Sequence, residues 1–197
     1  GVDFYDKIVM DSITRTYEIA HSRIEGFLPD NTVRLPDFVT PEGSTPDQAL
    51  AALCVEGLRH HRLHESAEYV DRTRRELSVI AARGFTKYFL TMKAISDRAH
   101  SSQLVGPGRG SAAGALVSYL LNITQVDPLK YDLQFERFLT KGGTGYPDID
   151  YDVAEPMDLK ESLIEEWGDN TVVPITNWNT LQLRSLVKDI SKFYGIE

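Results

Sequence analysis

Apolar residues recur at helical spacing over several stretches of the chain, and the residues between these stretches are typical of turns. Residues 5–24 carry apolar side chains three or four positions apart, which predicts an amphipathic helix. Glycines and prolines are frequent between Gly26 and Pro46, and this composition predicts a long connector. The next helix is expected to begin at Pro46, because Thr45 can cap its first turn and proline suits the first helical position.

The remainder of the chain is also predicted to be mainly helical. With 42% hydrophobic residues in 197, the chain can bury one substantial core. We expect an α+β fold, rich in helices, in which a small mixed sheet carries a group of acidic residues. The further elements are expected as helices over residues 66–83, ended by Gly84, and 87–100, then a helix over 157–167, a strand over 171–176 and a helix over 181–194.

The acidic residues lie in the sequence Pro-Asp-Ile-Asp-Tyr-Asp at residues 147–152. On a strand, Asp148, Asp150 and Asp152 would project from one side, where they repel one another unless a cation neutralises them or some protonate. Oxygen ligands without a thiol or imidazole nearby favour Mg²⁺ over Zn²⁺, so this segment is a candidate metal site for phosphate chemistry. An acidic turn explains the same six residues equally well, and both interpretations stay open at this point.

Two other kinds of metal site do not fit the sequence. A calcium-binding EF-hand loop starting at Asp148 would need glycine and glutamate where the chain has Val153 and Leu159. His60 and His64 have the spacing of zinc ligands on a helix, but no third ligand of a suitable type accompanies them. We therefore interpret them as surface histidines.

A glycine-rich segment, Val-Gly-Pro-Gly-Arg-Gly-Ser, occupies residues 105–111. The small and then apolar residues after Ser111 predict a helix that starts at this turn and packs closely on a neighbour. The free N–H groups of a helix start, the Ser111 hydroxyl and the Arg109 guanidinium together suit a phosphate. Taken alone, the segment is more simply a tight connection.

Two known nucleotide-binding motifs match this turn poorly. A Walker loop would require lysine before the serine, where the chain has Gly110. A dinucleotide fingerprint needs an acidic residue about twenty positions later at a strand end, but Asp127 precedes Pro128 in a polar stretch. The turn therefore does not indicate an ordinary ATPase or a dehydrogenase.

A Gly-Ser turn followed by an Asp-x-Asp pair resembles the palm of the nucleotidyltransferases related to polymerase beta. The longer sequence at residues 106–139, with residues 147–152, resembles more specifically the alpha subunit of the bacterial replicative DNA polymerase III, the C family of DNA polymerases. Most of the chain shares the resemblance, except for a looser match over the first forty or so residues. The matching flanks are residues 75–77, 84–85, 88–90 and 175–178.

The resemblance implies a helix-rich partial palm of the polymerase-beta-like type, with a small mixed β-sheet. Residues 1–43 would be the tail of the preceding PHP domain and a connector, and residues 44–197 a partial palm that lacks thumb, fingers and the third catalytic strand. It also implies that Asp148 and Asp150 are catalytic carboxylates that hold two Mg²⁺ ions in the intact enzyme. Asp152 shares their face by periodicity and is a further possible metal ligand.

The resemblance further implies where the nucleotide phosphates bind. Gly110 and Ser111 would contact the incoming triphosphate, with Arg109 close by. Arg137 would either point at phosphate or pair with a carboxylate, and both roles stay open. Family members usually carry a second arginine shortly before the aspartates, where this chain has a glycine-rich segment and only Lys141, a point charge without bidentate geometry.

The implied function is that of a DNA-directed DNA polymerase, in which the primer 3′-hydroxyl attacks a dNTP and expels pyrophosphate. Its partners would be the dNTP, primer-template DNA, and the remainder of the polymerase or other replisome subunits. Because no acidic strand is found between residues 171 and 197 to supply a third aspartate, we expect the chain alone not to extend a primer. A non-catalytic replication or scaffold module that retains a palm-like fold is the alternative.

Composition and charge modify this picture in four ways. A net charge of −8 opposes DNA binding, so we expect this piece to bind DNA weakly. Cys54 is the single cysteine and is expected in the core. The sequence has neither a membrane-spanning run nor a signal peptide, so we expect a cytoplasmic protein without membrane contact. Six arginines between residues 59 and 83 are interpreted as a solvated helix face in preference to a DNA-contacting one: Arg59, Arg62, Arg72, Arg74, Arg75 and Arg83.

Overall fold

The computed structural model describes residues 2–22, 38, 40, 43–143, 145–175, 178, 180 and 182–195. It divides the chain into two units, Gly1–Leu35 and Pro36–Glu197. The first unit contains α1 (Val2–Ser22), which confirms the predicted N-terminal helix. Its side chains from Tyr5 onward are exposed. The predicted connector lies largely outside the described residues.

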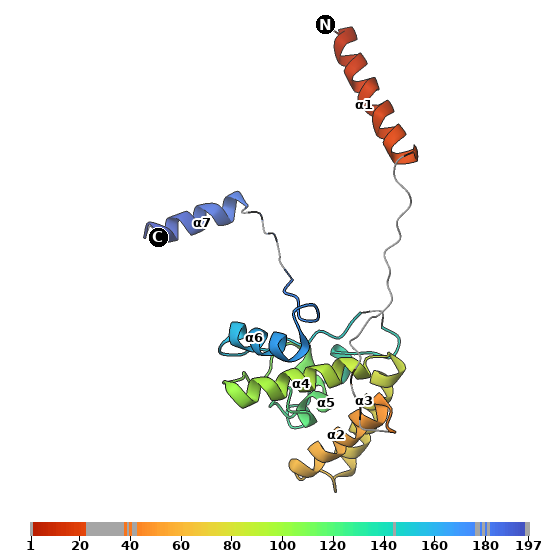
Figure 1. The fold of residues 1–197 in the computed structure, drawn as a ribbon, viewed down its shortest axis with the longest axis vertical. Helices are drawn as coiled ribbons and strands as arrows, with labels where there is room; N and C mark the ends of the chain where they lie inside the picture. Colours follow the sequence, from red (N-terminus) through yellow and green to blue (C-terminus); the bar gives the residue numbers. More distant parts are fainter. Residues whose placement is uncertain are drawn as a thin grey trace. The chain divides into compact units, whose positions relative to one another are not determined.

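The second unit is helical, as Figure 1 shows, and the helices predicted in it are present to within a few residues, except for the one expected to start at the glycine turn before Ser111. Short 3-10 helices, η1 and η2, occur in the middle of the chain. Within the described residues, no helix has the length and apolar character needed to cross a bilayer. The elements are α2 (Pro46–His60), α3 (Ala67–Ala82), α4 (Thr86–Ser102), η1 (Ser111–Gly114), α5 (Leu116–Leu120), η2 (Phe135–Arg137), α6 (Pro156–Trp167) and α7 (Leu183–Phe193).

The start of α2 shows why the sequence predicted these helices well. The Thr45 hydroxyl accepts a hydrogen bond from the Gln48 backbone N–H, and the Gln48 side chain accepts one from the Thr45 N–H. This reciprocal capping box satisfies two N–H groups that the helix itself leaves without partners. Pro46 occupies the first turn, as predicted.

The core lies where α2, α3, α4 and α5 meet. Cys54 is fully buried in it, which confirms the sequence prediction. Gly57 lets α2 approach α5 closely, because a Cβ atom there would lie 2.2 Å from the Leu120 carbonyl oxygen. Phe89 of α4 and Leu116 of α5 are also fully buried, so α4 and α5 share one apolar interior.

The predicted mixed sheet was wrong. Among the described residues there is no β-strand, and the only pairing of this kind is an isolated antiparallel bridge between Val105 and Val153. Exposed and buried side chains do alternate along the acidic segment, where Asp148 is exposed and Ile149 is only 9% exposed. The buried side chain packs on helical neighbours and not on a second strand. Alternation requires one buried face, and a helix can cover that face as well as a sheet can.

The predicted strand over residues 171–176 is also absent from its described part, residues 171–175. Val173 and Ile175 are 68% and 94% exposed, so their apolar side chains do not contribute to a buried face. Thr176 lies outside the described residues.

Candidate functional site

The glycine-rich turn at residues 105–111 has a backbone that only glycine adopts readily. Gly110 has φ 67° and ψ −163°, a combination essentially restricted to glycine. Gly108 has φ 113°, and a Cβ atom there would lie 2.9 Å from the Thr124 side chain. Both glycines are therefore required by backbone conformation, and Gly108 also by space.

The helix predicted after Ser111 is interrupted. Ser111–Gly114 form the 3-10 helix η1, Ala115 is extended at φ −93° and ψ 120°, and α5 follows with only five residues. The interruption coincides with close packing, since a Cβ atom on Gly114 would lie 2.8 Å from the Gln134 carbonyl oxygen. The turn consequently presents a short helical turn and not a long helix.

The glycine turn and the acidic segment lie against each other. A Cβ atom on Gly110 would be 2.6 Å from the Asp150 Oδ2 atom. The Gly106 N–H donates to the Asp152 carbonyl at 2.8 Å, and the Ala154 N–H donates to the Leu104 carbonyl at 3.0 Å. Two segments about forty residues apart in sequence are thus joined by backbone hydrogen bonds.

Arg109 places its guanidinium between two carboxylates. Its Nη1 atom lies 3.3 Å from Asp150 Oδ1, and its Nε atom lies 2.9 and 3.0 Å from the two carboxylate oxygens of Asp152. The hydrogen bonds to Asp152, and then the charges of Asp150 and Asp152, raise the pKa of Arg109 above its ordinary value. Arg109 is exposed, so solvent weakens these ion pairs.

Asp148 is exposed at the other end of the segment. The next residue, Ile149, donates its backbone N–H to the Tyr88 hydroxyl at 3.2 Å. Burial raises the pKa of Tyr88, and the negative charge of Asp148 raises it further. Asp148 therefore lies near enough to act electrostatically on both Tyr88 and Arg109.

A cavity of about 540 Å³ opens beside the glycine turn. Ser111 and Arg137 are both exposed on its wall, and the described residues give the Arg137 side chain no carboxylate partner. Three of the four residues expected to contact phosphate thus line one cavity. Its wall consists of Gly110, Ser111, Gly114, Asp132, Leu133, Gln134 and Arg137.

Most of the arginines between residues 59 and 83 contact the protein itself. Arg72 pairs with Glu76 at 2.5 Å and also donates to the Gly114 and Leu133 carbonyls, behind the cavity wall. Arg83 donates to the Thr140 and Gly145 carbonyls and so holds both ends of the glycine-rich segment before the aspartates. The remaining pairs are Arg74 with Asp71 and Arg75 with Glu136.

Comparison with known proteins assigns the family. The model of the family described as bacterial DNA polymerase III alpha NTPase domain matches residues 48–197. The chain belongs to this family. Its relatives include the DNA polymerase III subunit alpha of Bacillus subtilis, 39% identical over 83% of this chain and 15% of that protein, and that of Aquifex aeolicus, 33% identical over 94% of this chain and 17% of that protein. The Ureaplasma parvum protein of the same name is 33% identical over 98% of this chain and 20% of its own length.

The polymerase III alpha resemblance stated from the sequence is therefore confirmed, and the chain spans no more than a fifth of these three relatives. The comparisons do not assign roles to single residues. Among the described residues, no group of three or more His, Cys, Asp or Glu side chains is placed to hold a metal ion. The carboxylates of Asp148, Asp150 and Asp152 are therefore not grouped as a three-ligand metal site in this structure.

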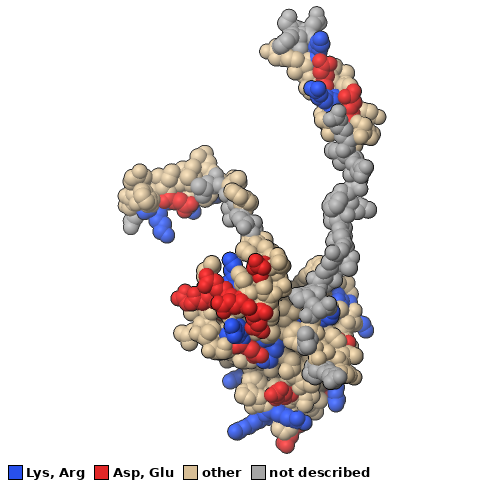
Figure 2. Space-filling model, in the orientation of Figure 1, with Lys and Arg blue, Asp and Glu red and all other residues tan. Residues whose placement is uncertain are grey.

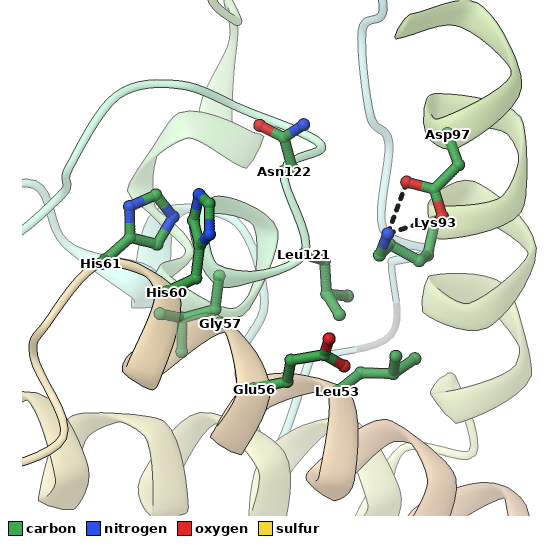
Figure 3. Close-up of a pocket in the computed structure, with 10 residues that line it drawn as sticks. Leu53, Glu56, Gly57, His60, His61, Lys93, Asp97, Leu121 and Asn122 are labelled. Carbon is green, nitrogen blue, oxygen red and sulfur yellow. Dashed lines mark hydrogen bonds and ion pairs between the residues drawn. The ribbon is translucent and has the colours of Figure 1, made fainter. Parts of the chain in front are cut away.

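A second pocket, of about 270 Å³, lies between α2, α4 and the turn after α5 (Figure 3). Lys93 and Asp97 of α4 bind each other on one side of it, and Glu56 and His60 of α2 line the other. Burial lowers the pKa of the neighbouring His61, and the charge of His60 lowers it further, so His61 favours the neutral form. His60 and His64 are both exposed.

Sequence reasoning missed some parts of this site in the polymerase III alpha chain. Asp132 and Gln134 line the cavity but have no motif of their own. Their positions five and three residues before Arg137, within the resembling sequence at residues 106–139, are the signal that could have pointed to them. Tyr88 was noted only as part of a resembling segment, although its hydroxyl contacts the backbone between two of the aspartates.

Proposed function

We propose that residues 44–197 form the part of a DNA-directed DNA polymerase palm that holds the incoming dNTP and the catalytic metal ions. The contact between Gly110 and Asp150 carries this proposal. Nucleotidyl transfer requires a cradle for phosphates beside carboxylates that hold divalent ions, and the turn and the carboxylate that we propose for these two roles are in contact at Gly110. The proposal does not include the predicted sheet.

The acidic residues fit Mg²⁺ in their chemistry. Asp148 and Asp150 would hold the ion through oxygen atoms alone, and Gly110 has no side chain that would press on the Asp150 carboxylate. When bound, Mg²⁺ would neutralise phosphate charge and lower the cost of deprotonating the primer 3′-hydroxyl. Asp152 is a weaker candidate for a metal ligand than Asp148 and Asp150, because Arg109 binds both of its carboxylate oxygens.

The triphosphate is expected in the cavity beside the turn. Ser111 would donate its hydroxyl to a phosphate oxygen, and Gly110 allows the phosphates to approach the backbone. Arg137 has the planar geometry for two hydrogen bonds to phosphate, and its lack of a carboxylate partner in the described residues supports this role. Arg109 pairs with Asp150 and Asp152, and its guanidinium could leave these carboxylates to bind a phosphate when the nucleotide is present.

Substrates and partners of the whole enzyme belong to the proposal as well. We expect dNTP and primer-template DNA as substrates, the rest of the polymerase and replisome subunits as partners, and the cytoplasm as the compartment. Figure 2 shows acidic side chains gathered over α6, contributed by Asp158, Glu161, Glu165 and Glu166. This surface repels phosphates, which supports weak DNA binding by this piece and the expectation that it does not extend a primer alone.

Calorimetric titration of the 197-residue chain tests the proposal. Mn²⁺, and then Mn²⁺ with dNTP, should bind the wild-type chain, and both signals should be lost in a variant that combines Asp148→Asn with Asp150→Asn. Asp71→Asn is the matched control, because Asp71 is an exposed acid that pairs with Arg74 away from the site. Equal titrations of the double variant and the wild type would favour the scaffold alternative.

A further inference from the structure

Besides its backbone hydrogen bonds to the glycine turn, the acidic segment has two hydrogen bonds with α4, made by the residues that alternate with the aspartates. Near one end, the Ile149 N–H donates to the Tyr88 hydroxyl at 3.2 Å. Near the other, the Tyr151 hydroxyl donates to the Ser96 Oγ atom at 2.9 Å. Both partners belong to α4, and the two anchored residues alternate with the three aspartates.

The hydrogen bonds from the Ile149 N–H to Tyr88 and from the Tyr151 hydroxyl to Ser96 are called anchors here. In the second anchor, a further hydrogen bond holds the Ser96 hydroxyl in place. Ser96 is fully buried and donates its single hydroxyl proton to the Asn122 carbonyl at 2.9 Å. Because that proton is used, the Ser96 oxygen accepts from the Tyr151 hydroxyl and does not donate to it. The His100 Nδ1 atom lies farther away, 3.3 Å from Ser96 Oγ and 3.4 Å from the Tyr151 hydroxyl. The hydroxyl group of Ser96 thus connects α4, the turn after α5 and the acidic segment in one defined orientation.

We infer that Tyr88 and Ser96 are positioning residues that set which side chains of the acidic segment face the glycine turn. The inference rests on the proposed function of that site. A rotation of the extended segment by one residue would turn Asp150 toward α4 and Ile149 toward solvent. Each anchor raises the fraction of molecules in which the aspartates face Gly110, and metal affinity scales with that fraction.

Removal of the two tyrosine hydroxyls tests this role. Mn²⁺ affinity of the 197-residue chain, measured by electron paramagnetic resonance, should fall about threefold to tenfold for Tyr88→Phe and for Tyr151→Phe, as expected for one lost hydrogen bond. Amide hydrogen exchange at Ile149 should accelerate in Tyr88→Phe. Tyr69→Phe is the matched control, since the Tyr69 hydroxyl donates to Asp127 at 2.8 Å and its loss should leave Mn²⁺ affinity unchanged.

The outcomes separate the two proposals. Wild-type Mn²⁺ binding that persists unchanged in Tyr88→Phe and Tyr151→Phe would overturn the positioning role and leave the proposed function standing. A wild-type chain that does not bind Mn²⁺ would overturn the proposed function and the positioning role together. Equal losses of affinity in Tyr69→Phe and Tyr88→Phe would show a general effect on folding and would also overturn the inference.

Discussion

Gly110 lies so close to Asp150 that a Cβ atom at position 110 would be 2.6 Å from the Asp150 Oδ2 atom. Real Cβ atoms essentially never approach an oxygen so closely, and the backbone of Gly110 is one that other residues avoid. Backbone conformation therefore requires glycine at this position, and a side chain there would displace the Asp150 carboxylate. This close approach brings the turn proposed to hold phosphates into contact with a carboxylate proposed to hold metal.

Gly110→Ala is expected to displace Asp150 and to abolish or strongly weaken Mn²⁺ binding. The strained backbone should also lower the free energy of unfolding by about 1–3 kcal/mol. Calorimetry and urea denaturation measure the two effects. Gly142→Ala serves as the control because a Cβ atom there meets nothing within 4 Å, and it should change stability by less than about 0.5 kcal/mol. Equal Mn²⁺ affinity in Gly110→Ala and the wild type would contradict the proposed site.

Arg109→Gln should change the affinities for metal and nucleotide in opposite directions. Without nucleotide, Arg109 competes with a metal ion for Asp150 and Asp152, so its removal should tighten Mn²⁺ binding about twofold to fivefold. With nucleotide, the guanidinium is expected to contact phosphate, so the same variant should bind dNTP more weakly. Titration of Mn²⁺ alone and of dNTP at saturating Mn²⁺ separates these effects.

The control for this variant is Arg74→Gln, which removes an exposed arginine paired with Asp71 at 3.4 Å. It should leave both affinities unchanged. A parallel weakening of Mn²⁺ and dNTP binding in Arg109→Gln would show that Arg109 supports the carboxylates instead of competing for them.

The sequence predicted the helices because their signals are local. Thr45, Pro46 and Gln48 determine the start of α2 within one turn, and Gly84 with φ 72° follows the end of α3. Local signals could not decide whether a sheet is present, because a β-strand needs a second strand to pair with, and that strand is usually distant in the sequence. Ile149 is buried as alternation predicted, but the hydroxyl that its backbone contacts comes from α4.

The sequence named candidate site residues but gave no indication of the contacts among them. Arg109 was expected to lie near phosphate from its place in the glycine turn, yet its bonds to Asp150 and Asp152 depend on how segments forty residues apart approach each other. The interruption of the helix at Ala115 likewise coincides with the packing of Gly114 against Gln134. Such long-range contacts leave no periodic pattern in the sequence.

Glu76→Gln should reveal that the buried Glu76 side chain makes a pH-dependent contribution to the free energy of unfolding. Glu76 is fully buried, where its carboxylate accepts the Val117 N–H at 2.9 Å and pairs with Arg72. Burial raises the pKa of Glu76, and the hydrogen bonds from Val117 and Arg72 oppose this shift only in part. Below about pH 4 the group is neutral in the folded and the unfolded chain and does not make stability depend on pH.

As the pH rises through the ordinary glutamate pKa of about 4.3, the unfolded chain releases the proton while the folded chain retains it. The free energy of unfolding of the wild type should therefore fall relative to Glu76→Gln from about pH 4 up to the raised pKa of the folded state. Urea denaturation of both proteins between about pH 4 and pH 8 measures this difference. A wild type that gains stability relative to Glu76→Gln over this range would show that the ion pair with Arg72 outweighs burial and that the pKa of Glu76 is lowered.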